Sequence, residues 1–465
     1  YLTIQKGIDE SDNSDTVLVA AGTYDGFILS EKGVNIGSLT ILNGDTSYIS
    51  ETILQGGTDT RIIEINNVAD TSYVIEGFTI QDASYFYNGA GIHLQDSNII
   101  LKNCVIKNCY SGNGLGGGMY GWGNRIVIDG CTFIDNQSYH SGGGAFLGGG
   151  SGQINILNSI FKNNSCGGGG GALNIDDGNL LINNSTFISN SCDDAGGAIL
   201  LHVNSSRSLF ITNSMFVGNY TNGDYDQDGG VLFINGSQTM NIDNSTFVDN
   251  GGAYGNFAIH DGALVNLNNS IIWGPAQNSF HLWSVNEANI PMVNISYSDL
   301  EGGENSINNI NGNVQWGDGN IDDDPLFVDP DNNDFTLQWG SPAIDSGDPN
   351  SPLDPDSTIA DMGAYFFEQT DLEAPTINID DISESVGTND DLVVNWTASD
   401  NMYLDIAHIY YSSDALQSLV FVDSVNAELG EYTFPIPDST LTNFSTFIIH
   451  VYDAWGNSAA DTSNF

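Results

Sequence analysis

The chain has 465 residues, of which 40% are hydrophobic, so it is long enough for more than one structural unit with a substantial core. Asp and Glu number 59 against 8 Lys and Arg, which gives a formal net charge of -51. A field of this sign attracts divalent cations and repels nucleic acid, which we exclude as a partner. No stretch approaches the roughly 20 apolar residues of a membrane-spanning helix, so no transmembrane segment is expected. Because the chain starts at Tyr1 without a leader, we expect a processed form.

The N-terminal segment, residues 3–27, reads TIQKGIDESDNSDTVLVAAGTYDGF. It resembles the opening of many secreted β-helix proteins, in which a short amphipathic helix precedes the first strand. The resemblance implies a helix over Ile4 and Ile8. Such a helix would cover the open end of a solenoid core, which otherwise exposes apolar side chains and unpaired strand edges.

Residues 75–275 contain an internal repeat with spacings of 26, 27, 28, 26, 29, 31 and 25 residues between its central positions. These positions are Ile80, Ile106, Phe133, Phe161, Phe187, Phe216, Phe247 and Ile272. Asn precedes most of them by three residues, at Asn103, Asn158, Asn184, Asn213, Asn244 and Asn269, with Gly130 as the one break in that run. Asn also follows by three residues, at Asn136, Asn164, Asn190, Asn219 and Asn250. Runs of two or three glycines recur with the same period, at residues 116–118, 142–144, 170–171, 196–197 and 229–230.

The repeat predicts one coil of a parallel β-solenoid. Short runs such as INILNSIF alternate apolar residues and are rich in β-branched types, which indicates strands. Coils stack at about 4.8 Å, so equivalent residues form columns, with Phe inside and both Asn series at corners. We expect the corner Asn side chains to be buried ladders bonded to backbone groups, with glycines supplying positive φ angles. Asn184→Ala should therefore destabilise far more than Asn179→Ala.

The motifs within the repeat resemble those of a known family. FIDN (133–136), FKNN (161–164), FISN (187–190), FVGN (216–219) and FVDN (247–250) accompany GGA or close variants. They are similar to the paired FxxN and GGA[ILV] motifs of polymorphic outer-membrane-protein repeats. That resemblance implies a right-handed parallel β-helix, extracellular or on a bacterial cell surface, and often adhesive.

The C-terminal third contains two further sequence patterns. Residues 323–367, with the phrases SPAIDSG and DMGAY, resemble the closing segment of bacterial β-helix exoproteins. After a linker the strands lose the Asn and Gly columns and resemble a bacterial immunoglobulin-like or fibronectin-like sandwich, with Trp396 in its core and DAWGN as its last turn. The predicted fold is all-β, a right-handed parallel β-helix followed by a β-sandwich. The predicted units are residues 1–315 with an N-terminal cap, a closing segment 316–369, a linker 370–374 and the sandwich 375–465.

Candidate sites for chemistry are few. DYDQDG, with Asp224, Asp226 and Asp228, opens like a calcium loop, but the twelfth position is Asn235, so we expect either a partial structural calcium site or a solvated turn. Asp329, Asp331 and Asn333 form a weaker acidic cluster. The sequence places Tyr120, Trp122, Arg125 and His140 on neighbouring coils, where they could form a glycan-contacting patch. The carboxylate pairs at 176–177 and 193–194 are candidates for glycoside hydrolysis only because coils stack.

The cysteines pair by position. Cys104 and Cys131 lie two residues before their central residues, and Cys166 and Cys192 lie five after theirs. Each pair should face across neighbouring coils, within disulfide reach, with stacked free thiols as the alternative. Cys109 has no counterpart in either case.

From this pattern we expect a secreted or cell-surface scaffold without catalytic activity, in the form of an adhesin-like stalk or an extracellular filament component, with no catalytic residues assigned. Its partners would be other protein chains or cell-surface glycans, and self-assembly is open. Two alternatives remain at this point, a carbohydrate-active β-helix enzyme such as a polysaccharide lyase or glycoside hydrolase, and a passive glycan-binding protein. Apart from calcium, no cofactor is expected.

Overall fold

The structure is a computed structural model that describes the whole chain except residues 69–72, 151, 203–206, 224–228, 275–277, 286–287, 383–390, 415, 436–444 and 464–465. The chain divides into two compact units, Tyr1–Phe367 and Glu368–Phe465. Nearly all regular structure in both units is β, as the sequence predicts. Each unit is described by itself.

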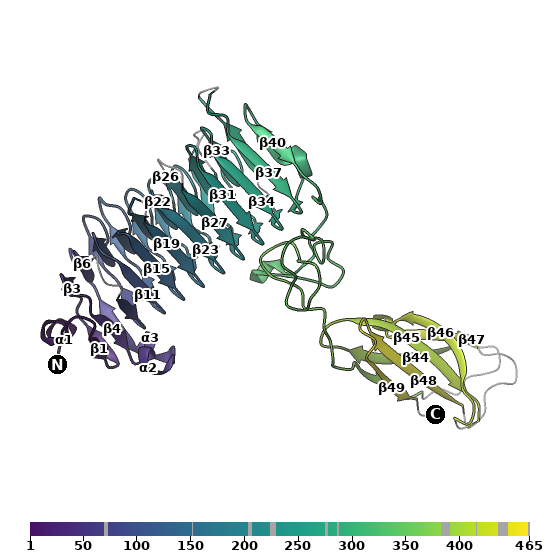
Figure 1. Cartoon of the computed structure of the whole chain (residues 1–465). Coiled ribbons are helices and arrows are strands. Elements are labelled where there is room, and N and C mark those ends of the chain that lie inside the picture. Colours follow the sequence, from purple (N-terminus) through teal and green to yellow (C-terminus); the bar gives the residue numbers. More distant parts are fainter. Residues whose placement is uncertain are drawn as a thin grey trace. The chain divides into compact units, whose positions relative to one another are not determined.

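The first unit is a parallel β-helix (Figure 1). Sheet A, whose strands carry many of the labels in Figure 1, contains β1(Thr16–Val19), β4(Asn35–Ser38), β7(Val74–Glu76), β11(Ile99–Lys102), β15(Arg125–Asp129), β19(Gln153–Leu157), β23(Asn179–Asn183), β27(Ser208–Thr212), β31(Thr239–Asp243), β34(Leu264–Asn268), β37(Met292–Ser296) and β40(Asn313–Trp316). Sheet B contains β2(Gly22–Tyr24), β5(Thr52–Gln55), β8(Thr79–Gln81), β12(Val105–Lys107), β16(Thr132–Ile134), β20(Ile160–Lys162), β24(Thr186–Ile188), β28(Met215–Val217), β32(Thr246–Val248), β35(Ile271–Trp273) and β38(Asp299–Leu300).

Two more sheets close each coil. Sheet C contains β3(Phe27–Ser30), β6(Ile63–Asn66), β10(Ile92–Gln95), β14(Met119–Trp122), β18(Ala145–Gly148), β22(Leu173–Asp176), β26(Ile199–His202), β30(Leu232–Asn235), β33(Phe257–His260), β36(Phe280–Trp283) and β39(Ile307–Asn309). The short sheet D contains β9(Ser84–Tyr85), β13(Tyr110–Ser111), β17(Gln137–Ser138), β21(Ser165–Cys166), β25(Ser191–Cys192) and β29(Tyr220–Thr221). A central coil runs from sheet C to A, B, D and back to C.

The core of the β-helix is a set of residue columns, as predicted. Phe161, Phe187 and Phe216 are fully buried, and successive rings stack with centroids 5.1 and 4.6 Å apart and planes within 4° of each other. Aliphatic residues of sheets A and C fill the rest of the interior. Because each coil covers the apolar face of the one before it, the stack has one continuous core.

The corner between sheets B and D contains a buried asparagine ladder. Asn190 is fully buried, and its Oδ1 accepts from both the backbone N and the Nδ2 of Asn164, each at 3.0 Å. Its own Nδ2 donates to the carbonyl of Phe161 and to Oδ1 of Asn219, both at 2.9 Å. Asn136, Asn164, Asn219 and Asn250 are buried in the same ladder. Every amide group in its centre has a partner, which removes the cost of burying it.

The corner between sheets A and B differs from the prediction. Asn184 is exposed and lies in the left-handed region with φ 48°, and its Nδ2 bonds only to Oδ1 of Asn158. The equivalent Asn103, Asn158, Asn213, Asn244 and Asn269 also have positive φ, but only Asn269 is buried. The expectation of a second buried ladder at this corner is therefore wrong for most of the series. Asn is used here because it tolerates the left-handed conformation, which also explains why Gly130, with φ 63°, replaces it once.

Serine supplies the buried ladder at this second corner. The backbone N of Ser159 donates to Oγ of Ser185 at 3.1 Å, and the backbone N of Ser185 donates to Oγ of Ser214 at 3.2 Å. The ladder continues through Ser245 and Ser270. Its first member is Cys131, whose N donates to Oγ of Ser159.

The glycine pairs follow sheet D, where the chain turns into sheet C. Gly196 has φ 67°, and a Cβ on it would lie 2.1 Å from the carbonyl oxygen of Ile199. Gly197 has no room either, because a Cβ would lie 2.3 Å from the carbonyl of Gly230 in the next coil. The backbones approach too closely here for any side chain.

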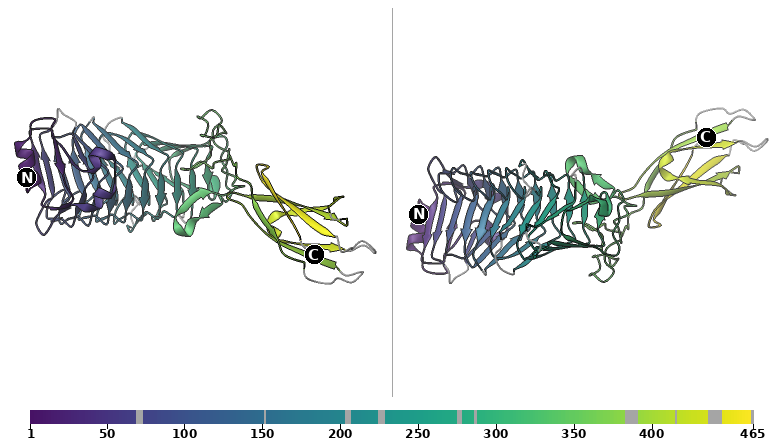
Figure 2. Two further views of the ribbon diagram at one scale, coloured as in Figure 1. Left: turned by 90° about the horizontal axis from the view of Figure 1, so that it is seen from below. Right: turned by 90° about the horizontal axis from the view of Figure 1, so that it is seen from above.

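Helices are few in the described residues. α1(Ile4–Glu10) buries Ile4 and Ile8 in the core and contacts β1 and β3, so the predicted helix is present at the N-terminal end of the stack (Figure 2). Thr3 caps it by accepting from the backbone N of Lys6. Short helices α2(Thr40–Asn43) and α3(Ser47–Glu51) connect β4 to β5. No described helix has the length and apolar content needed to cross a bilayer.

The segment after β40 packs on the outer face of sheet B. It contains β41(Phe327–Asp329), the 3-10 helix η2(Pro330–Asn332) and β42(Asp334–Leu337). Another 3-10 helix, η1(Gly303–Ser306), lies earlier, between β38 and β39. Its apolar side chains bury Met215, Val248 and Ile271, which point outward from sheet B. The backbone N of Asp348 also donates to Oδ1 of Asn269 at 2.7 Å, which explains why that corner residue is buried. The segment covers the side of the last coils.

The second unit is a β-sandwich of two antiparallel sheets. One sheet contains β43(Thr376–Ile379), β44(Asp391–Ser399) and β47(Glu431–Pro435), and the other contains β45(Leu404–Ser412), β46(Val420–Asn426), β48(Thr446–Asp453) and β49(Ser458–Thr462), with η3(Ala427–Leu429) between β46 and β47. Trp396 is in the core, as predicted, and its Nε1 donates to the carbonyl of Ala427 at 3.0 Å. DAWGN forms the turn between β48 and β49, also as predicted.

All five cysteines are buried free thiols. Cys166 and Cys192 are register partners on β21 and β25, as their positions predicted. Burial raises the pKa of Cys131 well above its usual value, and the neighbouring Cys104 adds to this. The structure therefore agrees with stacked thiols, the alternative to disulfides.

Candidate functional site

A groove of about 600 Å³ lies over sheet D and its following turns. Its floor is built by outward side chains that are register partners on successive coils, Gln137, Ser165 and Ser191, and Tyr110 precedes them in the same row. Because side chains alternate in a strand, Ser111, Ser138 and Cys166 point inward and are buried. The repeat thus places a row of small polar side chains along one face, one per coil.

Two tyrosines beside that floor line the groove and are exposed. Tyr139 is 57% exposed and Tyr110 is 38% exposed. Tyr139 and His140 contact each other edge to face, with ring centroids 4.9 Å apart. The backbone N of His140 donates to the carbonyl of Gly114, and its own carbonyl accepts from Gly168, so the turn is held between two coils. Exposed rings beside hydroxyl and amide groups suit a sugar, which has an apolar C–H face and polar edges.

Charge in the sheet D groove is sparse. Among the described residues that line it, Asp193 is the one carboxylate, and there is no Lys or Arg. Asp193 Oδ1 accepts from Nδ2 of Asn222 at 3.4 Å. Its described lining residues therefore suit a neutral ligand and offer no carboxylate pair.

A second groove, of about 650 Å³, lies near the N-terminal end of sheet C. Arg61, Glu64, Asp25, Tyr85 and Gln5 are among its lining residues. Sequence reasoning did not single out any of these five. Only the register, which places Glu64 beside His93 on the next coil, could have pointed to them.

Arg61 is held by the β-helix itself. Its guanidinium donates to the carbonyls of Gly89 and Asn88 and to Oε2 of Glu64, at 3.2, 2.9 and 3.0 Å, and it lies 4.7 Å from the centroid of the Tyr85 ring. A hydrogen bond from Asn66, followed by the charge of Arg61, lowers the pKa of Glu64 despite its burial. Glu64 is therefore ionised at neutral pH, and Arg61 serves mainly to join two coils.

The outer face of sheet C has a stacked row of rings. Tyr120 lies between His93 and Phe146, with centroids 5.3 and 5.6 Å away and planes within 14° and 9°. Burial, and next the charge of Arg61, lower the pKa of His93 to about 4, so it is neutral at physiological pH. In this row Phe146 is buried, whereas His93 and Tyr120 are partly exposed; further along the same face Leu200 and Phe233 are buried.

The predicted glycan patch is divided between these regions. Tyr120 and Trp122 lie on β14 in sheet C, and Arg125 begins β15 in sheet A after the next turn. His140 lies at the other edge of sheet C, in the turn that precedes β18, and lines the sheet D groove. The structure brings Tyr120 and Trp122 onto one face but does not bring His140 to Arg125.

The candidate acidic pairs have structural roles. Asp177 binds Arg207 through two hydrogen bonds of 2.7 and 2.9 Å. Burial raises the pKa of Asp176, and His202 on the next coil lowers it. Asp176 ends β22 in sheet C, whereas Asp193 follows β25 of sheet D, so the two pairs lie on different sides of the coil.

The predicted calcium loop, Asp224, Asp226 and Asp228, lies outside the described residues. Asp329, Asp331 and Asn333 form the turn around η2, where Asp331 and Asn333 are exposed and Asp329 Oδ2 accepts from Asn332. Sequence reasoning missed a third acidic group, Asp371, Asp400 and Asp453, in the second unit. Their separation in sequence hides them.

Comparison with known families supports the fold. A model of the right-handed β-helix region matches residues 61–235, and a model of a domain of unknown function, DUF5123, matches residues 240–350. The predicted fold, a right-handed parallel β-helix followed by a β-sandwich, is confirmed. No curated protein matches the chain. No solved structure matches it either.

Proposed function

We propose that this chain is a secreted or cell-surface scaffold without catalytic activity, an adhesin-like stalk or filament component that binds glycans in the sheet D groove. The observation that carries the proposal is the pair of exposed rings, Tyr110 and Tyr139, beside a polar floor. Each coil adds one polar side chain to that floor, so the groove suits an extended ligand. Structural calcium remains part of this proposal.

The sparse charge of the groove favours binding over catalysis. Glycoside hydrolysis uses two carboxyl groups that flank the scissile bond. The described lining residues of the sheet D groove provide only Asp193. A net charge of -51 also disfavours acidic polysaccharides, so neutral glycans are the expected ligands.

The second unit fits a spacer. Its strands divide into antiparallel sheets β43-β44-β47 and β46-β45-β48-β49, which supports the proposal of an immunoglobulin-like or fibronectin-like sandwich. Such modules commonly space other domains, and this role agrees with the resemblance of the repeat to polymorphic outer-membrane proteins. A bacterial cell surface or the extracellular medium is the proposed location.

The enzyme alternative rests on the second groove, because it combines Arg61 with Glu64 and Asp25. Since three N–H groups of Arg61 already bond within the β-helix, its capacity to bind a substrate carboxylate is reduced. Glu64→Gln tests this alternative directly.

The experiment is a screen of the purified full chain against neutral and acidic glycans, with and without calcium. We expect binding of a neutral glycan without new reducing ends or unsaturated sugars. Tyr139→Ala should weaken that binding about 10-fold, because ring–sugar stacking is lost. Tyr87→Ala is the matched control, since Tyr87 is 61% exposed and does not line the groove.

Two results would contradict the proposal. Turnover that Glu64→Gln abolishes would assign the second groove to an enzyme. Binding that Tyr139→Ala and Tyr87→Ala weaken equally would remove the sheet D groove as the site.

A further inference from the structure

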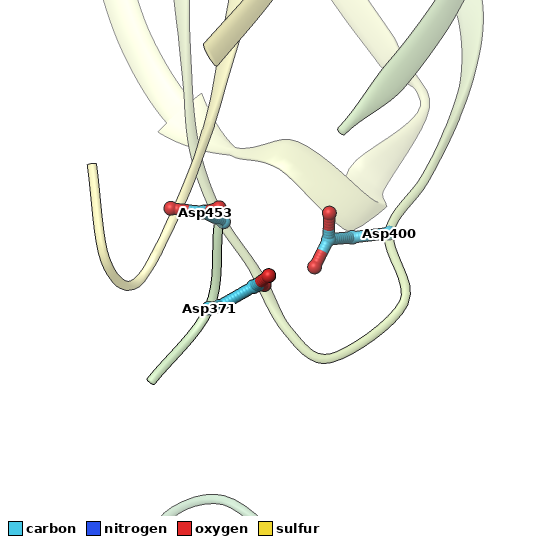
Figure 3. Close-up of side chains that lie close together, drawn as sticks. All are labelled: Asp371, Asp400 and Asp453. Carbon is cyan, nitrogen blue, oxygen red and sulfur yellow. The ribbon is translucent and has the colours of Figure 1, made fainter. Parts of the chain in front are cut away.

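Three aspartates converge at one end of the sandwich (Figure 3). Asp371 lies in the lead-in segment, residues 368–374, that precedes β43; Asp400 follows β44; and Asp453 ends β48. One carboxylate oxygen from each lies within 4.8 Å of the other two. Figure 3 shows the carboxylates of Asp371 and Asp400 facing each other, with Asp453 beside them, on three separate stretches of chain.

Asp371 and Asp453 are buried, Asp400 is partly buried, and Asp371 and Asp400 each have one carboxylate oxygen without a donor. Asp371 is 7% exposed and Asp453 is 2% exposed. Oδ1 of Asp371 accepts from the backbone N of Glu373 at 2.9 Å, whereas its Oδ2 is buried without a hydrogen-bond donor. Oδ2 of Asp400 accepts from two backbone N–H groups at 3.0 Å, and its Oδ1 is likewise buried without a donor. An unpartnered carboxylate oxygen in such a position indicates a missing partner.

No side-chain cation of this unit can supply that partner. The last Lys or Arg in the sequence is Arg207, so residues 368–465 contain neither. The two histidines of the unit lie on strands of the sheet, where His408 contacts Phe421 and His450 contacts Tyr410. Three ionised carboxylates at this separation, partly removed from water, repel one another strongly unless a positive charge lies between them.

We propose that Asp371, Asp400 and Asp453 form a calcium site. Calcium binds oxygen ligands at about 2.4 Å, so two of its ligands lie at most about 4.8 Å apart, and the oxygens of this cluster lie within that limit. Oxygen-only ligands disfavour zinc and copper, which prefer nitrogen and sulfur. Backbone carbonyls and water complete the six to eight ligands that calcium takes. This site is separate from the predicted loop at Asp224.

The ion would attach the lead-in segment to two loops of the sandwich. Existing hydrogen bonds already bring the partners together: Nδ2 of Asn457 donates to the carbonyl of Asp371 at 3.0 Å, and Nε1 of Trp455 donates to the carbonyl of Gln369. Asp453 Oδ1 accepts from the backbone N of both Trp455 and Asn457, which fixes its orientation. Calcium therefore orders the beginning of the second unit.

The test is calorimetric titration of the full chain with calcium chloride in high salt, which screens weak binding to the acidic surface. We expect one tightly bound ion per chain. Asp400→Asn and Asp371→Asn should each lower its affinity at least about 10-fold. Asp405→Asn is the matched control, because Asp405 is an exposed carboxylate on neighbouring β45 and should leave the affinity unchanged.

Calcium should also raise the unfolding temperature of the wild-type sandwich, a result that needs no variant to fold. The proposal would be overturned by a wild-type chain that binds no ion above the weak surface level. It would be overturned equally if the tight ion survives in both Asp400→Asn and Asp371→Asn. Glycan binding in the sheet D groove is a separate measurement, so failure of one proposal leaves the other intact.

Discussion

The two units satisfy their buried polar groups in different ways. In the β-helix, the amide of Asn190 bonds to equivalent groups one coil above and one coil below. In the sandwich no equivalent neighbour exists, and the carboxylates of Asp371 and Asp400 retain buried oxygens without donors. A repeating fold can supply partners from its own copies, whereas a fold without repeats needs a partner of another kind.

The two units also differ in how many neighbouring groups are affected by one substitution. A ladder residue serves two neighbours, so its loss affects three coils. A residue of the three-aspartate group serves one site. Substitutions of ladder residues should therefore lower the free energy of unfolding more than substitutions of the three aspartates.

The largest effect is expected for Asn190→Ala. The change leaves the N and Nδ2 of Asn164 and the carbonyl of Phe161 buried without their partner. At about 1 to 3 kcal/mol for each stranded group, the free energy of unfolding should fall by about 3 kcal/mol or more. Equilibrium unfolding in urea measures it.

Asn184→Gly is the matched control. Asn184 is exposed with φ 48°, and glycine adopts that conformation without strain, as Gly130 does at the equivalent corner. The free energy of unfolding should change by less than about 0.5 kcal/mol. Equal losses in the two variants would contradict the distinction between the corners.

The next largest effect is expected for the pH dependence of stability and concerns Asp299. This buried carboxylate of the β-helix belongs to no hydrogen-bonded ladder and has no positive charge among the causes of its pKa shift. Burial raises its pKa to about 7, and nearby Asp322, Asp323 and Asp324 add to this against one hydrogen bond from the backbone N of Asp323. The folded chain therefore holds a proton that the unfolded chain, with a pKa near 4, releases. Stability from this group is present at low pH and is lost as the pH rises from about 4 to 7.

Asp299→Asn removes this titration. Between pH 5.5 and 8 the unfolding free energy of the wild type should fall relative to that of the variant by roughly 2 kcal/mol. Urea unfolding of both proteins at the two pH values provides the measurement. A constant difference would show that Asp299 does not titrate in this range.

The smallest effect is expected for Phe187→Leu. The ring stacks on Phe161 and Phe216, and leucine stays apolar but is smaller and loses both stacking contacts. The free energy of unfolding should fall by about 1 kcal/mol. Phe210→Leu, at a ring that is 39% exposed on β27, should have almost no effect, and an equal loss there would mean that the stack adds nothing specific.

The fold was predictable because equivalent residues of successive repeats become register partners in neighbouring coils. The positions of Phe161 and Phe187 predicted their stacking, and the buried ladder through Asn190 followed from the same spacing. The role of Asn184 was not predictable from spacing alone. Side-chain capacity to bond is the same at both corners, and only the backbone conformation, with φ 48°, separates them.

The binding sites were less predictable. His140 was identified, but its groove depends on Tyr110 and Tyr139, whose exposure is decided by which loops cover them. Asp371 and Asp453 are separated by most of the sandwich, so only the folded chain brings them together. Their phrases, TDLEAPT and DAWGN, look like ordinary turns in the sequence.

Because the ladder connects equivalent residues of successive coils, whole coils could be added to or removed from the β-helix. Asn164 and Asn190 are 26 residues apart and occupy the same position in successive coils. Removing residues 165–190 would join Asn164 to Ser191, the residue that follows Asn190, and the columns would continue with one member fewer. A deletion that does not join equivalent positions of two coils would misalign the sheets. The β-helix can therefore change its length only by whole coils.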